Sequence, residues 1–395
     1  VRLVGALREA GFDLTIRDVF LLRTVTRLAE AVAEQAGEVS QFRPVEPFGL
    51  ISDADRARLP EGVVDAYPLS LVQTGMIVEM LMGSGEPVYH NVSSFRVRDE
   101  RPFSADVFRE VVGLAVERHE VLRTSVDLDG FSEPMQLVRA GAVLPVVVED
   151  LRGLDESARF AALVEFAGRE RGELFDLVTA PLMRITVFLE SDEAWRIVFT
   201  HCHAVTDGWS LNTLLGELVA DYRVLVAGGV VGTRSVGVRY ADFVAAELGS
   251  LSGGVDEAFW LGVVGGRVPF ALPEGWGDRD VVREAFEVRV PVADLDEGLR
   301  SLARSSGVSL KSVLHAAHVK ALSMLTREPE FFTGLVCHGR PAVPGSEQVL
   351  GMHLNTLPFP VERGARTWRE LVERVFEQET EIWAHRHFPL PAIQR

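Results

Sequence analysis

Cysteine is scarce in this sequence: only Cys202 and Cys337 occur among 395 residues, and they lie too far apart for a CxxC metal motif. This scarcity excludes a disulfide framework and a four-cysteine zinc site. There is also no apolar run of the roughly 18 to 20 residues that a membrane helix needs, and the sequence does not open with a basic segment followed by an apolar stretch. From these absences we expect a cytoplasmic protein with no membrane partner.

Basic side chains are outnumbered by acidic ones. The 40 Lys and Arg residues stand against 57 Asp and Glu, which gives a formal net charge of −17. Such a charge repels phosphate backbones, so we expect no nucleic-acid partner. With 47% hydrophobic and 25% charged residues, the composition is otherwise that of a globular protein, and the length fits two or three domains.

The chain divides into five segments by its periodicity. Residues 1–36 predict short helices, and residues 37–62 predict a linker because prolines punctuate them and apolar periodicity fades. Helices and strands then alternate in two blocks, residues 63–226 and 240–395, which a Gly/Val-rich connection at 227–239 joins. This alternation predicts an α/β fold with two lobes.

Individual elements follow from the spacing of apolar residues. The first block predicts helices over residues 107–118 and around 160–167, the latter with an apolar face of Phe160, Leu163, Val164 and Ala167, and strands over 93–98, 143–148, 183–189 and 195–200. The second block predicts helices near 240–248, 309–326 and 367–384, and strands near 285–291, 332–337 and 356–361.

The most informative segment is the polar loop at residues 200–210 (THCHAVTDGWS), between a predicted strand and a predicted helix. His203 is a candidate general base, because imidazole titrates near neutrality and a strand can fix its ring. Asp207 would orient this ring or lock the loop through an arginine. The alternative is that His203 is a core histidine with satisfied hydrogen bonds. His201 shares a strand face with His203, but no third ligand lies nearby, so we expect no metal site.

Residues 202–210 resemble the HHxxxDGWS motif of the condensation domains of nonribosomal peptide synthetases. The other core motifs of that family occur in the family's order at residues 67–76 (YPLSLVQTGM), 118–124 (RHEVLRT), 240–243 (YADF), 351–357 (GMHLNTL) and 387–390 (HFPL). Residues 1–36 are similar to the last helices of a peptidyl carrier protein, without the half that bears the phosphopantetheine serine.

The resemblance implies both a fold and an activity. The fold would be two lobes similar to chloramphenicol acetyltransferase in a V-shaped pseudo-dimer, preceded by the carrier-protein remnant. The activity would be peptide-bond formation between a donor thioester on an upstream carrier protein and the amine of an aminoacyl thioester on a downstream carrier protein. The carriers would bring 4'-phosphopantetheine, adenylation domains would be neighbours in the same synthetase, and no permanently bound cofactor is expected.

The resemblance also assigns roles to residues. His203 is the expected catalytic residue, and the backbone amide near Gly208 is an oxyanion donor at a helix N-terminus. Asp207 would pair with Arg340 from the other lobe, although Arg340 beside a turn is also compatible with a surface position. Cys202 and Arg123 would support the site. Residues that would line a substrate tunnel are Trp209, Ser210, Asn355 and His119. The alternative for Trp209 and Ser210 is that they cap and pack the following helix. For Asn355 the alternative is to anchor a loop, and for His119 it is a solvated helix end.

Two departures from the family pattern stand out. Cys202 occupies the position of the first motif histidine, and His201 is displaced from it by one residue. The sequence also ends before the seventh motif, so we expect an incomplete C-terminal lobe. An epimerisation-type domain and a catalytically silent domain that recruits carriers stay open as alternatives, and Cys202 is the feature that favours the second.

Overall fold

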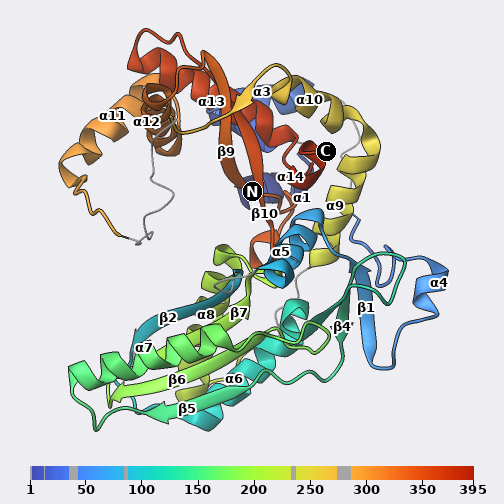
Figure 1. Ribbon diagram of the computed structural model, residues 1–395, viewed down its shortest axis with the longest axis vertical. Helices are drawn as coiled ribbons and strands as arrows, with labels where there is room; N and C mark the ends of the chain where they lie inside the picture. The colour runs from blue at the N-terminus through green and yellow to red at the C-terminus, as the bar shows by residue number, and fades with distance from the viewer. Residues whose placement is uncertain (1, 13, 35–42, 84–87, 233–236, 274–285) are drawn as a thin grey trace. The chain divides into compact units, whose positions relative to one another are not determined.

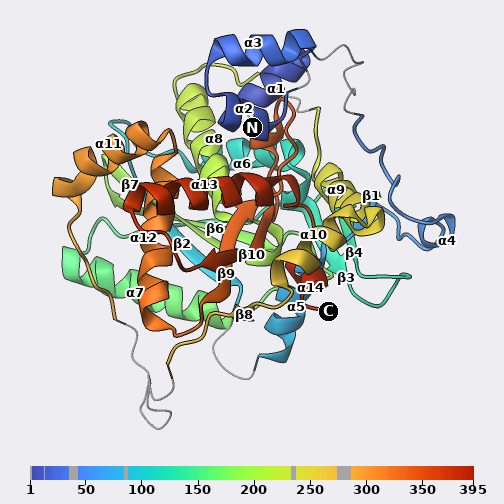
Figure 2. The same cartoon turned by 90° about the horizontal axis from the view of Figure 1, so that it is seen from above.

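The computed structural model describes residues 2–12, 14–34, 43–83, 88–232, 237–273 and 286–395 (Figures 1 and 2). Contacts divide the chain into two compact units. The first unit comprises Val1–Ile16, Ala29–Gly249 and Gly339–Leu354, and the second comprises Arg17–Leu28, Ser250–His338 and Asn355–Arg395. The chain opens with three helices: α1 (Arg2–Glu9), α2 (Ile16–Leu22) and α3 (Val25–Glu34).

The main sheet of the first unit has the strand order β2-β7-β6-β5. Its strands are β2 (His90–Arg98), β5 (Val146–Asp150), β6 (Met183–Ser191) and β7 (Ala194–Cys202). β7 is antiparallel to both neighbours, whereas β5 and β6 are parallel. Helices α6 (Ala105–Arg118) and α8 (Gly208–Val226) pack on one face in the largest apolar core, and α7 (Glu156–Gly172) covers the other (Figure 1).

A second sheet of the first unit has the order β1-β4-β3. It comprises β1 (Val63–Pro68), β3 (Thr124–Asp127) and β4 (Met135–Arg139), and its neighbours along the chain are α4 (Asp53–Arg56), α5 (Leu71–Met82) and the 3-10 turn η1 (Glu120–Arg123). Helix α9 (Tyr240–Gly253) follows the connection after α8. Ser70 caps α5 in a reciprocal capping box with Gln73, which explains why the helix begins there.

The second unit contains a sheet with the order β10-β9-β8. Its strands are β8 (Val268–Pro269), β9 (Glu330–His338) and β10 (Leu354–Glu362), and its helices are α10 (Val255–Val264), α11 (Asp296–Ser306), α12 (Leu310–Leu325), α13 (Trp368–Ala384) and α14 (Leu390–Ile393). Phe331, Phe359 and Val372 lie fully inside its apolar core, which joins the sheet to α13.

The mixed α/β architecture is confirmed, and most predicted strands and helices are present within a few residues of their expected bounds. The predicted strand near 285–291 is wrong for the described residues 286–291, where Phe286, Val288 and Val290 alternate but are all more than 70% exposed. Alternation alone does not make a strand, because a strand also needs a hydrogen-bonded neighbour. Residue 285 lies outside the described residues.

The predicted apolar face of α7 is also wrong in part. Phe160 and Val164 are 69% and 54% exposed, whereas Phe166 is buried and Leu163 packs beside it on the sheet. The buried stripe runs through Leu163, Phe166 and Glu170, which lie three to four residues apart and so share one side of the helix. Arg184 pairs with the Glu170 carboxylate, so this position carries an ion pair rather than an apolar contact.

Candidate active site

The backbone around His203 is held from two sides within the first unit. A 3-10 turn spans His203–Val205 between β7 and α8. The His203 N–H donates to the carbonyl oxygen of Tyr89 at 2.7 Å, and Gln73 Nε2 donates to the carbonyl oxygen of Ala204 at 2.8 Å. The main sheet and α5 therefore fix the turn that carries the imidazole.

The His203 ring has one nitrogen engaged. Its Nδ1 lies 2.8 Å from the carbonyl oxygen of Thr206. A carbonyl oxygen only accepts hydrogen bonds, so in the neutral ring Nδ1 carries the hydrogen and Nε2 keeps its lone pair. The side chain is half-buried, so it combines a fixed orientation with access to solvent. This is the arrangement that a general base requires.

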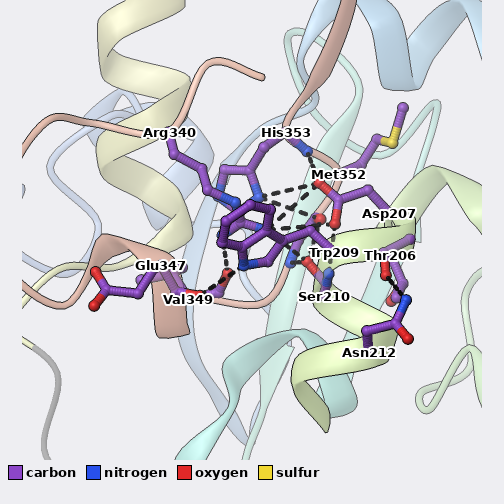
Figure 3. Close-up of polar contacts among 12 residues, drawn as sticks. Thr206, Asp207, Trp209, Ser210, Asn212, Arg340, Glu347, Val349, Met352 and His353 are labelled. Atoms are coloured by element: carbon purple, nitrogen blue, oxygen red, sulfur yellow. Dashed lines mark hydrogen bonds and ion pairs between the residues drawn. The ribbon is translucent and has the colours of Figure 1, made fainter. Parts of the chain in front are cut away.

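Asp207 caps α8 and is only 1% exposed. Its carboxylate accepts hydrogen bonds from the Ser210 N–H at 2.7 Å and the His353 N–H at 3.2 Å. Arg340 completes the set with an ion pair at 3.3 Å (Figure 3). Sequence reasoning gave the capping role to Trp209 and Ser210, but the cap is Asp207, since its side chain accepts the free N–H of the first helical turn.

The carboxyl of Asp207 stays ionised in spite of its burial. Burial by itself disfavours the charge, but hydrogen bonding with His353 and the charge of Arg340 outweigh it and hold the pKa of Asp207 well below its usual range. Burial has the opposite effect on His353: it lowers the pKa of this ring to about 4, so the imidazole is neutral near pH 7. Asp207 and Arg340 are therefore the charged partners, and His353 contributes hydrogen bonds.

Ser210 links α8 to the segment around Gly351 (Figure 3). Its hydroxyl donates to the Gly351 carbonyl oxygen at 2.9 Å and accepts from the Gly351 N–H at 3.0 Å and from Arg340 at 2.9 Å. The Asp207 N–H also donates to the Gly351 carbonyl oxygen at 3.2 Å. Gly351, far along the chain, is thus tied through both its N–H and its carbonyl oxygen to the first turn of the helix that follows His203.

Arg340 lies in the first unit, although it follows β9 of the second. The segment Gly339–Leu354 belongs to the first unit because Leu350 and Met352 are part of its largest core. Arg340 was expected to come from the other lobe, but it belongs to the same unit as Asp207. The expected contact between Arg340 and Asp207 is present. The guanidinium is 1% exposed and lies 5.7 Å from the Trp209 ring, so it is not a surface group.

Trp209 is half-exposed, and its ring lies against the Arg340 guanidinium (Figure 3). Its indole N–H donates to the Glu347 carbonyl oxygen at 3.0 Å. This contact ties α8 to the 3-10 turn η4 (Ser346–Gln348). The exposed face of the ring is compatible with a substrate contact, which stays a prediction.

Cys202 and His201 are both buried. Burial raises the pKa of the Cys202 thiol to about 11, so it stays protonated. Burial, followed by the proximity of His203, lowers the pKa of His201 to about 4. Neither nitrogen of His201 has a hydrogen-bond partner among the described residues, and its ring centroid lies 6.3 Å from that of His203. The displaced histidine is thus a neutral neighbour of His203: it lies on β7, whereas His203 lies in the turn that follows.

Gly208 is exposed and opens the 19-residue helix α8. Its N–H lies among the first amides of the helix, where the helix dipole favours negative charge. Asn212 donates to the Gly208 carbonyl oxygen at 2.7 Å, so that oxygen is already engaged. The amide is compatible with the predicted oxyanion role.

The second motif forms a separate buried cluster in the first unit. Arg118 pairs with Glu217 at 2.8 Å and with Asp221 at 3.1 Å, and His119 Nε2 lies 2.8 Å from the same Glu217. These contacts fasten α6 to α8 and exclude a solvated helix end. Arg123 donates weakly to a backbone carbonyl and lines a cavity of about 310 Å³ with Arg118 and His119.

Asn355 lies on β10 in the second unit. Its Nδ2 donates to the carbonyl oxygens of Arg386 at 3.1 Å and Phe388 at 2.8 Å, and its Oδ1 accepts from the Leu390 N–H at 3.1 Å. These bonds anchor the loop that carries the sixth motif. A tunnel-lining role stays a prediction beside this one.

Sequence reasoning missed several contributors. Gln73 and Gly351 lay inside recognised motifs, but no pattern indicated that they bond to the His203 turn and to Ser210. His353 also lay inside a recognised motif without any sign of its contact with Asp207, and Tyr89 carried no sequence signal at all. Among the described residues, no group of three or more His, Cys, Asp or Glu side chains is placed to hold a metal ion, and no helix has the length and apolarity to cross a membrane.

An α/β fold that presents a histidine with an available Nε2 at a strand end, beside a helix N-terminus, defines a class of protein able to assist acyl transfer. The model of the condensation-domain family matches residues 63–395. The chain therefore belongs to the condensation-domain family. This membership confirms the predicted class, a condensation domain of the kind found in peptide synthetases.

Two relatives of the chain are much longer synthetases. The chain is 36% identical over 398 residues to AMB antimetabolite synthetase AmbE of Pseudomonas aeruginosa, in an alignment that covers 98% of this chain. It is 29% identical over 401 residues to phosphinothricin tripeptide synthetase PhsB of Streptomyces viridochromogenes, again over 98% of this chain. The chain spans only 18% and 32% of the lengths of these two relatives.

Solved structures support the fold. The starter condensation domain of rhizomide synthetase RzmA aligns with a TM-score of 0.67 at 18% identity, covering 84% of this chain and 74% of that one. The first condensation domain of the calcium-dependent antibiotic synthetase aligns with a TM-score of 0.66 at 20% identity, covering 82% of this chain and 76% of that one. The predicted fold class, similar to chloramphenicol acetyltransferase, is thereby confirmed.

Proposed function

We propose that this condensation domain joins the acyl or peptidyl group of an upstream carrier to the amine of an aminoacyl group on a downstream carrier. The carriers and an adenylation domain would belong to the same cytoplasmic synthetase. The observation that supports this proposal is the His203 ring, whose Nδ1 is fixed by Thr206 while Nε2 is left to accept. The phosphopantetheine arms belong to the carriers and arrive with the substrates.

His203 Nε2 would accept the proton that the amine loses. In the reaction the amine nitrogen bonds to the thioester carbonyl carbon, the carbon–sulfur bond breaks, and the departing thiolate takes up a proton. His203 holds the transferred proton between these events, so no external acid or base is consumed. Fixing both substrates near the ring contributes roughly 7 to 11 kcal/mol to lowering the barrier.

Gly208 and its helix would stabilise the charge that develops on the carbonyl oxygen. The oxygen becomes negative when the amine adds, and the first amides of α8 provide donors at the positive end of the helix. Asp207 caps the same helix, and with Arg340 it keeps the helix start in register with the His203 turn. The ion pair between Asp207 and Arg340 would therefore act by fixing the position of the helix start, since both groups are fully buried.

We also propose that residues 1–36 are the end of a carrier protein, residues 37–62 a linker, and residues 63–226, 227–239 and 240–395 the two lobes with their connection. Three short helices and the turn at Gly11, with φ of +87°, agree with the carrier part. The family match begins at residue 63, while the AmbE alignment includes 98% of this chain. The longer alignment supports an upstream segment shared by the two proteins.

A reconstituted condensation assay tests the proposal. The chain is mixed with a donor carrier and an acceptor carrier, each loaded with an aminoacyl group, and the product on the acceptor is measured by mass spectrometry. We expect His203→Ala to lower the rate at least about 100-fold. The control is His318→Ala, which changes an exposed histidine in the second unit.

Two results would contradict the proposal. Equal product formation by the native chain and His203→Ala would remove the base role. Absence of product from both, together with retained binding of the acceptor carrier, would favour the carrier-recruiting alternative instead.

A further inference from the structure

Tyr89 has an uncommon backbone conformation. Its φ is +57°, and the other described residues with positive φ that are not glycine are Arg23 and Phe48. Side chains other than glycine disfavour this region, with asparagine and aspartate the best tolerated. A tyrosine held there indicates that the surrounding contacts require this backbone direction.

The contacts of Tyr89 lead directly to His203. Tyr89 immediately precedes β2, whose first residue His90 pairs with Cys202 at the end of β7. The Tyr89 carbonyl oxygen accepts the His203 N–H at 2.7 Å. The two rings lie with their centroids 6.4 Å apart at an interplanar angle of 49°. Tyr89 thus contacts His203 through its backbone and also stands beside the imidazole.

Helix α5 fixes the far end of the Tyr89 side chain. The phenol donates to Glu79 Oε2 at 2.9 Å. The same helix holds the next residue of the turn through the bond from Gln73 to the Ala204 carbonyl oxygen. The ring therefore cannot swing away from His203 without breaking its bond to α5.

We propose that Tyr89 is a positioning residue for His203, its ring forming a side wall that keeps Nε2 pointed toward the substrate amine. This inference rests on the proposed function. The positive φ of Tyr89 contributes to this positioning, because it directs the Tyr89 carbonyl oxygen toward the His203 N–H while the Tyr89 ring stays next to the imidazole. The hydrogen bond from the phenol to Glu79 holds the Tyr89 ring in place, and the ring is the part that positions the His203 imidazole.

Three substitutions separate the ring from the backbone. Tyr89→Asn removes the ring but keeps a residue that tolerates the left-handed region, and Tyr89→Phe keeps the ring. Phe48→Asn is the matched control, because Phe48 is an aromatic residue of the same unit with φ of +64°, in contact with Arg56. Should Tyr89→Asn not fold, Tyr89→Gly carries the same expectation, since glycine adopts this conformation freely.

In the condensation assay we expect Tyr89→Asn to lower kcat by at least about tenfold with KM little changed, as a misplaced catalytic group does. The thermal midpoint should fall only slightly, because the Tyr89 ring is only partly buried against the core. Tyr89→Phe should keep most of the activity, and Phe48→Asn should match the native chain. A native rate for Tyr89→Asn, or an equal loss in Tyr89→Phe, overturns the inference.

Nitrogen-15 NMR spectra of the histidine-labelled chain test the inference without a measurement of catalytic turnover. In the native chain His203 should show one tautomer, with the hydrogen on Nδ1. In Tyr89→Asn we expect a mixture of tautomers or a broadened signal, and an unchanged His203 signal overturns the inference. His203→Ala, assayed in parallel, tests the proposed function separately: if it turns over at the native rate, the base role fails whatever Tyr89 does.

Discussion

Removing one partner of the ion pair between Asp207 and Arg340 should strongly destabilise the first unit. Asp207→Asn keeps the shape of the side chain but leaves the Arg340 guanidinium, which is 1% exposed, without its opposite charge. Removing one partner of a buried pair typically costs about 3 to 5 kcal/mol in the free energy of unfolding. The amide also replaces one of the two carboxylate oxygens by an NH2 group, so it can accept from the Ser210 N–H or from the His353 N–H but not from both.

Urea denaturation followed by tryptophan fluorescence measures this loss, and Trp209 lies beside the Arg340 guanidinium. With an unfolding slope of about 3 kcal/mol per molar urea, the expected midpoint shift is between about 1 and 1.7 M. Asp192→Asn is the control, because it removes a carboxylate that is 81% exposed and pairs with Arg152 on the surface. We expect its midpoint to match that of the native chain.

A double substitution tests the physical reason. Asp207→Asn with Arg340→Met leaves no unpaired charge, so it should be more stable than Asp207→Asn alone. Equal midpoints for Asp207→Asn and Asp192→Asn would refute the role of the pair. A double variant no more stable than Asp207→Asn would show instead that the lost hydrogen bonds, rather than the stranded charge, cause the damage.

Two further predictions concern groups that burial keeps uncharged. His201 and His353 have pKa values of about 4 in the folded chain, below the unfolded value of 6.5, so unfolded chains take up more protons between these limits. Stability should therefore fall as the pH drops from 6.5 toward 4, by up to about 1.4 kcal/mol per pH unit for each ring. A urea midpoint that stays constant from pH 7 to pH 5 would contradict this. Burial raises the pKa values of Cys202 and Cys337 to about 11 and 12, so a thiol reagent at pH 8 should label neither in the native chain and both in urea; rapid native labelling would show that the thiols are accessible.

The sequence predicted those parts of the site that are close together along the chain. The spacing of His203 and Asp207 placed both on one loop, because a strand and a helix with clear periodicity flank it. The contact of Asp207 with Arg340 needed the family resemblance, since the two lie 133 positions apart in the sequence. The bond from Ser210 to Gly351 spans a similar distance and depends on side-chain packing, which no local pattern encodes.

Errors in the fold prediction have the same origin. On α7 the residues Phe160 and Val164 looked like part of a buried stripe, but the helix turns its other side to the sheet. Residues 286–291 alternate like a strand but have no partner in the described chain. The φ of Tyr89 follows from contacts with β7 and α5 and could not be predicted from the residue type, which disfavours it.

The Ser210 hydroxyl has a consequence for the order of events in catalysis. Its hydrogen and both acceptor positions are engaged by Gly351 and Arg340, and the Cys202 thiol is buried and protonated. Neither side chain is able to take the acyl group from the donor and hold it as an ester or thioester. Under the proposed function, an acyl intermediate on Ser210 or Cys202 is therefore excluded. We then expect sequential rather than ping-pong kinetics in the condensation assay.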